Sequence, residues 1–111
     1  MNAKDQPHAF WCFSFAYKNP DEAGTAYERC RDLIFREDID AGIYRIFLGG
    51  NCYVALVGIG IPEEPDVDRL TEICWKGESA QLPNEVVLTL ALRHEQFRRP
   101  EGVRFERRAS F

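Results

Sequence analysis

The chain has 111 residues and a formal net charge of −4, which indicates a single domain and argues against a general nucleic-acid binder. Hydrophobic residues make up 45% of the chain and charged residues 29%, as in an ordinary soluble globular protein. No apolar run approaches the ~20 residues of a membrane span, and residues 1–9 lack a signal-peptide pattern. These features predict a cytoplasmic protein that folds around one core.

The charge is spread unevenly along the chain. Residues 1–92 carry eight Lys or Arg and fifteen Asp or Glu, a net charge of −7, whereas residues 93–111 carry six Arg and three Glu, a net charge of +3. We interpret the basic end as a solvated tail, because exposed ion pairs contribute little to stability. The predicted organisation is a flexible leader at 1–9, one α+β domain at 10–108 and a tail at 109–111.

The first predicted elements are a strand at residues 10–17 and a helix after it. Large aromatic side chains alternate with small ones along this strand, as the two faces of a strand require. Asn19 can cap the helix, Pro20 suits its first position, and Glu22 lies three residues after the cap. An apolar stripe at helical spacing then continues, and we expect the helix to end near Glu37.

A β-hairpin is the clearest local pattern in the chain. Two apolar runs at residues 43–48 and 52–59 flank the turn sequence Gly49-Gly50-Asn51. Both faces of the second run are apolar, whereas a half-exposed antiparallel strand would alternate with polar residues. We therefore expect the strands at 10–17 and 52–59 to be covered on both sides.

The last third of the chain is less clear. A second helix is predicted to open at Pro65-Asp66 and to end at Gly77. Residues 85–92 alternate like a strand, but the opening Pro-Asn-Glu sequence before them and their composition favour an extra helix near 83–98. If residues 85–92 are helical, the last strand is predicted at 103–108. If they form a strand instead, that strand closes the sheet.

The element order β-α-β-β-α-β indicates an α+β fold of the ferredoxin-like (βαββαβ) kind, a two-layer sandwich with an antiparallel sheet and its helices on one face. Over residues 10–92, this order and the apolar patterning resemble the dimeric α+β barrels, small ferredoxin-like proteins that pair sheet to sheet. A second copy or a bound ligand would then cover the other face, because monomers rarely expose large apolar patches. The group includes both enzymes and non-catalytic modules, so the fold alone selects no function.

The four cysteines give no sign of a metal site. They have no CxxC or paired Cys/His spacing, and each lies in an apolar segment. We interpret them as small buried hydrophobes rather than as disulfide or redox groups. They are Cys12, Cys30, Cys52 and Cys74.

No catalytic constellation is present, but four residues are candidates for lining a ligand site. His8 precedes the first strand, which carries Trp11. Arg45 is the only charge in the hairpin strands and could bind a carboxylate, and Tyr53 belongs to the second strand of the hairpin. A packing or surface role is preferred for His8 and for the other histidine, His94. An edge-strand role is preferred for Arg45.

The RNA-recognition motif shares the ferredoxin-like fold. Its strand signature is mostly lost at residues 49–54, however, and Arg45 is the only basic residue near the sheet. We therefore expect no nucleic-acid partner. The best-supported function is that of a non-catalytic module acting through homodimerisation and through protein or small-ligand binding. The ligand would be apolar or carboxylated, and no cofactor or metal is expected. The alternative is a cofactor-free enzyme of the dimeric α+β barrel type.

Overall fold

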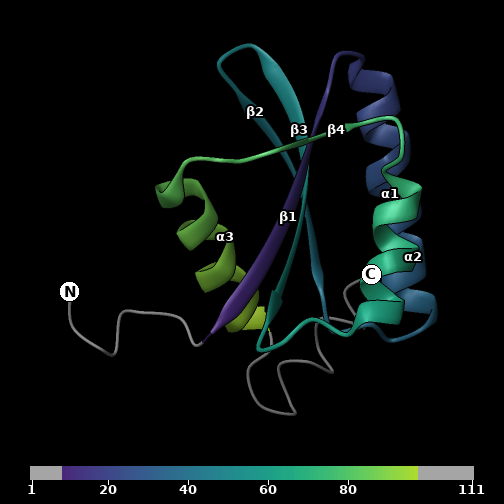
Figure 1. Ribbon diagram of the computed structural model, residues 1–111, viewed down its shortest axis with the longest axis vertical. Coiled ribbons are helices and arrows are strands. Elements are labelled where there is room, and N and C mark those ends of the chain that lie inside the picture. The colour runs from purple at the N-terminus through teal and green to yellow at the C-terminus, as the bar shows by residue number, and fades with distance from the viewer. Residues whose placement is uncertain (1–8, 98–111) are drawn as a thin grey trace.

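A computed structural model describes residues 9–97, which form an α+β fold with one sheet and three helices. In chain order the elements are strand β1 (Phe10–Tyr17), helix α1 (Pro20–Arg36), strand β2 (Gly42–Leu48), strand β3 (Asn51–Ile59), helix α2 (Glu64–Ile73), strand β4 (Glu78–Ala80) and helix α3 (Asn84–Phe97). The four strands lie in the order β2-β3-β1-β4, and all neighbours are antiparallel (Figure 1). The two strands predicted to be covered on both sides, β1 and β3, are therefore the central ones.

The helices lie on both faces of the sheet. Helices α1 and α2 cover one face and α3 covers the other (Figure 1). The prediction of helices on one face only is therefore wrong, whereas the extra helix near 83–98 is confirmed as α3. The physical reason is the apolar second face of β3, where Ala55 and Val57 pack with Leu90 and Ala91 of α3. Helix α3 thus covers the face of the sheet that we expected a second copy or a ligand to cover.

The main core lies between the sheet and the pair α1 and α2. Val54 and Leu56 of β3 are fully buried on this face, together with Cys30 of α1 and Leu70 of α2. Successive strand residues point to opposite faces, so β3 contributes to both cores in turn. The expectation that β3 is covered on both sides is confirmed.

Local sequence signals place α1 and the hairpin where they were expected. Asn19 has an extended backbone, and its side-chain oxygen accepts a hydrogen bond from the Asp21 N–H at 2.9 Å. Pro20 takes the first helical position, and the helix ends at Arg36. In the hairpin turn, Gly49 and Gly50 have φ values of 58° and 82°, which residues with a Cβ rarely adopt.

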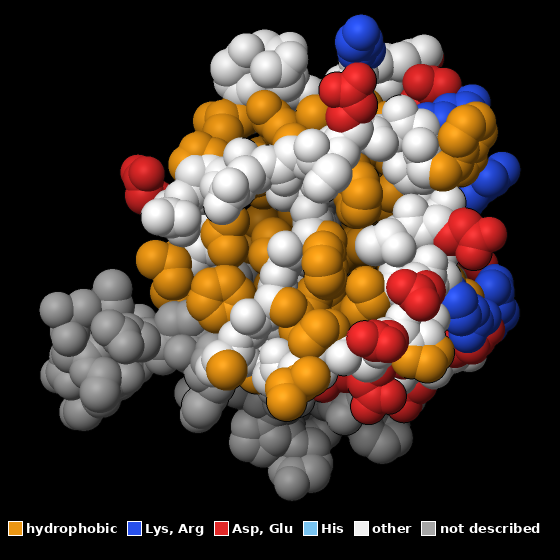
Figure 2. Space-filling view, viewed as in Figure 1, with side chains coloured by type: hydrophobic (Ala, Val, Ile, Leu, Met, Phe, Trp, Pro, Cys, Tyr) orange, Lys and Arg blue, Asp and Glu red, His pale blue; other side chains and the backbone are white. Residues whose placement is uncertain are grey.

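The fourth strand is not the one that the sequence pattern indicated. Strand β4 pairs only with residues 14–16 of β1, and the Ser14 hydroxyl donates to the Ala80 carbonyl at 2.7 Å. The strand predicted at 103–108 lies outside the described residues, as do positions 1–8 of the leader and the tail. Hydrophobic side chains gather on the side of the molecule where β1 and β4 lie, between α3 and the pair α1 and α2 (Figure 2). Phe13 of β1 is partly exposed.

Helix α2 ends earlier than expected. It stops at Ile73, so Gly77 is not its terminator. A Cβ on Gly77 would lie 2.8 Å from the Tyr17 ring, which shows that close packing against β1 is what requires a glycine there. Within the described part of the chain, no helix is long and apolar enough to span a membrane.

An ion pair on the surface joins α1 to α2. Arg69 donates two hydrogen bonds to the Glu37 carboxylate, and these lower the pKa of Glu37 below its usual value. Because the folded-state pKa is the lower one, the stabilisation is present above the ordinary glutamate pKa and is lost as the pH falls through the folded-state pKa.

We expect Arg69→Met to raise the pKa of Glu37 toward its ordinary value and to weaken the acid dependence of stability. Carboxyl NMR titration and urea unfolding between neutral and acidic pH measure both effects. Lys76→Met, which removes a separate ion pair with Glu22, is the control and should leave the Glu37 titration unchanged. An unchanged Glu37 pKa in Arg69→Met would contradict the pairing.

Candidate ligand-binding site

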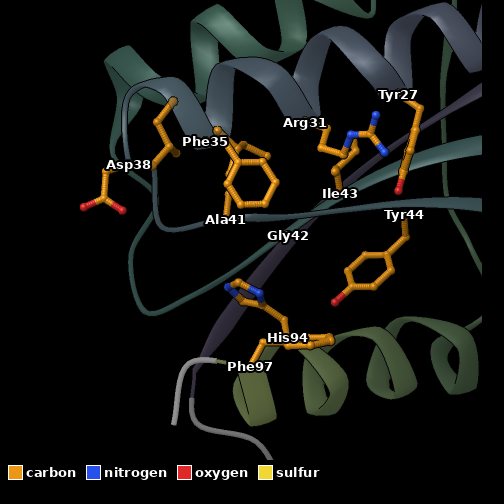
Figure 3. Close-up of a pocket in the computed structure, with 12 residues that line it drawn as sticks. Tyr27, Arg31, Phe35, Asp38, Ala41, Gly42, Ile43, Tyr44, His94 and Phe97 are labelled. Carbon is orange, nitrogen blue, oxygen red and sulfur yellow. The ribbon is translucent and has the colours of Figure 1, made fainter. Parts of the chain in front are cut away.

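A cavity of about 220 Å³ opens beside β2, at one edge of the sheet. Helix α1 forms one wall, the start of β2 forms the floor, and the last turns of α3 form the other wall (Figure 3). Apolar and aromatic side chains make up most of the lining, with a small number of polar groups among them. This combination is typical of small-molecule sites, and the volume lies just below the usual range, so only a small ligand would fit.

His94 is the buried polar group of this cavity. Its side chain is 1% exposed, and its Nε2 atom has no hydrogen-bond partner among the described residues. Nε2 lies 3.6 Å from Oδ1 of Asp40, a distance that allows charge attraction but exceeds a hydrogen bond. Buried polar atoms are nearly always hydrogen-bonded to protein, water or ligand. His94 therefore lines the cavity with its ring, while its Nε2 atom is buried behind the wall, on the side of Asp40, without a hydrogen-bond partner among the described residues.

Gly42 lets a second polar group come close to His94. A Cβ at this position would lie 2.9 Å from His94 Nδ1 and 3.3 Å from the Tyr44 hydroxyl. The imidazole and the phenol therefore converge over the bare backbone of Gly42, and both line the cavity (Figure 3). The φ angle of Gly42 is not positive, so the glycine is required here for space.

The α1 wall adds a positive charge. The Arg31 guanidinium lies 5.5 Å from the centroid of the Tyr27 ring, which is one helical turn earlier, and this cation–π contact holds it beside the cavity. Phe35 extends the same wall by one more turn and is 38% exposed. The cavity thus has a cation and aromatic rings on one side and an imidazole with a phenol on the other (Figure 3).

The four sequence candidates do not meet at this cavity. Trp11 lies over Gly58 of β3, Arg45 packs near α1 with its guanidinium 5.5 Å from the Phe47 ring, and Tyr53 packs against the α3-side core. None of these three lines the cavity beside β2. His8 lies outside the described residues.

The residues that do line the cavity were given ordinary roles from sequence. Arg31 falls on the outer side of an amphipathic helix, and His94 was assigned to packing or to the surface. Their separation in the chain hides their proximity, because α1, β2 and α3 meet only through the sheet. The one local signal is Gly42, a glycine at the start of a strand where a side chain would normally be expected.

The remaining acidic and sulfur side chains do not form a metal centre in the described part of the chain, where no cluster of three or more His, Cys, Asp or Glu could hold an ion. No family model, curated protein or solved structure matches the chain. The function must therefore be argued from the site itself.

Proposed function

We propose that the protein is a small non-catalytic α+β module that binds a small aromatic carboxylate in the cavity beside β2. The buried imidazole of His94 carries this proposal. It lines an apolar cavity while its Nε2 lacks a hydrogen-bond partner, at a cost of about 1–3 kcal/mol for a buried polar atom. This atom is buried on the side of Asp40, so a ligand reaches it, directly or through a water molecule, after a small shift of the imidazole, and the hydrogen bond made then removes that cost.

The other walls define the chemistry of the ligand. Arg31 offers two parallel N–H donors, which match the two oxygens of a carboxylate. Phe35 and Phe97 line opposite walls and are 38% and 42% exposed, so an aromatic ring between them would cover apolar surface. A hydroxyl on that ring would reach the polar corner formed by His94 and Tyr44. A hydroxyl-bearing aryl carboxylate combines these features.

A thermal-shift screen of small carboxylates tests the proposal. Binding to the native state raises the melting temperature by mass action, by about 5 °C at ten times the Kd for a domain of this size. We expect hydroxybenzoate-type compounds to give this shift and benzoate to give less. The corresponding uncharged amides are expected to give none.

A matched pair of arginine variants identifies the site. Arg31→Met is expected to abolish the shift, whereas Arg29→Met, on another side of the same helix, is expected to retain it. A shift that survives in Arg31→Met, or the absence of a shift with every aryl carboxylate, would overturn the proposal.

A second candidate function rests on the convergence of His94 and Tyr44 over Gly42. An imidazole and a phenol in an apolar cavity can exchange a proton with a bound substrate, as a cofactor-free enzyme would require. Chemical change of a compound that binds, lost in Tyr44→Phe, would favour this candidate over the non-catalytic one.

We further infer that the fold is a variant of the ferredoxin-like arrangement. The two β-α-β units, β1-α1-β2 and β3-α2-β4, interleave in the sheet order β2-β3-β1-β4, which supports this relationship. Helix α3 is an addition to that pattern. The homodimer stays a prediction; what supports it now is the apolar edge of β1, where residues 10–13 have no partner strand on the β4 side within the described residues.

A further inference from the structure

Two cysteine thiols lie side by side in the main core. Cys30 of α1 and Cys74 at the end of α2 have their sulfur atoms 3.9 Å apart, and both side chains are fully buried. The Cys30 thiol also donates toward the Leu70 carbonyl at 3.6 Å. All four cysteines of the chain are free. The two helices that form one layer of the molecule therefore meet at a dithiol.

The surroundings of this dithiol make the two sulfurs unequal. Hydrogen bonding to Cys74, and then burial, raise the pKa of the Cys30 thiol. The same hydrogen bond lowers the pKa of Cys74, with a smaller contribution of the same sign from the Tyr17 phenol. Tyr17 is itself buried. A negative charge in this cluster is thus best accommodated on Cys74.

We propose that Cys30 and Cys74 form a reversible disulfide that joins α1 to α2 when the protein meets a low-molecular-weight disulfide such as oxidised glutathione. The separation of 3.9 Å must shorten to about 2.0 Å, which side-chain rotation and a small helix shift can supply. The proposal is independent of the ligand site beside β2, because it rests on a different set of contacts.

The reaction proceeds by two exchanges. The Cys74 thiolate attacks one sulfur of oxidised glutathione, whose S–S bond breaks and releases one glutathione thiolate. Cys30 then loses its proton and attacks the Cys74 sulfur of the mixed disulfide, which releases the second glutathione thiolate. The protein loses two electrons and two protons, and one oxidised glutathione becomes two reduced ones.

The rate of this reaction is limited by how often the buried Cys74 sulfur becomes accessible to oxidised glutathione. Cys74 is the C-terminal cap of α2, followed by the exposed Trp75 and Lys76, so opening of one helix end is enough to expose its sulfur. Oxidation should therefore be slower than at an exposed thiol and still faster than global unfolding. The cross-link closes a loop between positions 44 residues apart, which restricts the unfolded chain and stabilises the fold.

The test is oxidation of the full-length protein in glutathione buffers of graded redox potential, followed by alkylation and peptide mapping. We expect the intact mass to fall by two hydrogens on oxidation and the Cys30 and Cys74 peptides to be linked. Cys12 and Cys52 should stay free and should therefore be alkylated. The melting temperature should rise by about 10 °C and return on reduction. The Cys12→Ala/Cys52→Ala variant should behave in the same way, and Cys74→Ala should form no internal disulfide.

Three outcomes would overturn the proposal. They are a disulfide between other cysteines, a product that stops at the mixed disulfide with glutathione, and no oxidation of the native protein in buffers that oxidise the unfolded chain. Peptide mapping of the unaltered chain decides among these outcomes, so the test does not depend on whether Cys74→Ala folds.

Discussion

Replacing Gly58 with Ala is expected to lower the free energy of unfolding by about 3 kcal/mol, the upper part of the range for overpacking a core. Gly58 of β3 pairs with Trp11 of β1, and a Cβ at Gly58 would lie 2.1 Å from two carbons of the Trp11 indole. Atoms cannot approach so closely, and Trp11 is packed against the main core, so the ring cannot move away freely. Urea unfolding measures the loss.

Gly24→Ala is the matched control, because the same chemical change should have the opposite sign there. Gly24 lies inside α1, and a Cβ would be 3.5 Å from the nearest atom, which belongs to Arg45. A helical glycine costs about 0.5–1 kcal/mol relative to alanine, so this variant should be more stable by about that amount. Equal effects of the two substitutions would contradict the stacking of Trp11 on Gly58.

Local chemistry explains which elements could be predicted from sequence. The cap at Asn19 and the two glycines at Gly49-Gly50 act within a few residues, so α1 and the hairpin were expected close to where they lie. Gly58, in contrast, looks like any glycine that bends a strand, and only the pairing of β3 with β1 reveals the indole that covers it.

Elements that depend on distant partners were missed or left ambiguous. Strand β4 has three residues, Glu78–Ala80, and no apolar alternation; it exists because residues 14–16 of β1 offer an open edge. Residues 85–92 fit both a strand and a helix by spacing, and the apolar second face of β3 is the partner against which the helix packs. The cavity is a third case, because Arg31, Gly42 and His94 approach one another only after the sheet has formed.

Replacing His94 with Leu is expected to separate binding from folding. Leu has a similar volume and no polar atom, so the variant loses the cost of the unpaired Nε2 and gives up only the weak attraction to Asp40, whose side chain is 45% exposed. The free energy of unfolding should stay unchanged or rise by about 1 kcal/mol. Affinity for the aryl carboxylate should fall at least about tenfold, because one hydrogen bond to the ligand is lost.

Urea unfolding and calorimetric titration measure the two quantities on the same preparation. Tyr44→Phe is the companion variant: it removes one hydroxyl and keeps the ring, so a smaller loss of affinity is expected, with the cavity walls intact. A histidine that serves only the core would give the reverse pattern, with His94→Leu losing about 2 kcal/mol or more of stability while binding is unchanged. Residues that bind ligands commonly lower the stability of the protein that carries them. A His94→Leu variant that is stable and no longer binds would therefore show that this imidazole serves ligand binding rather than folding.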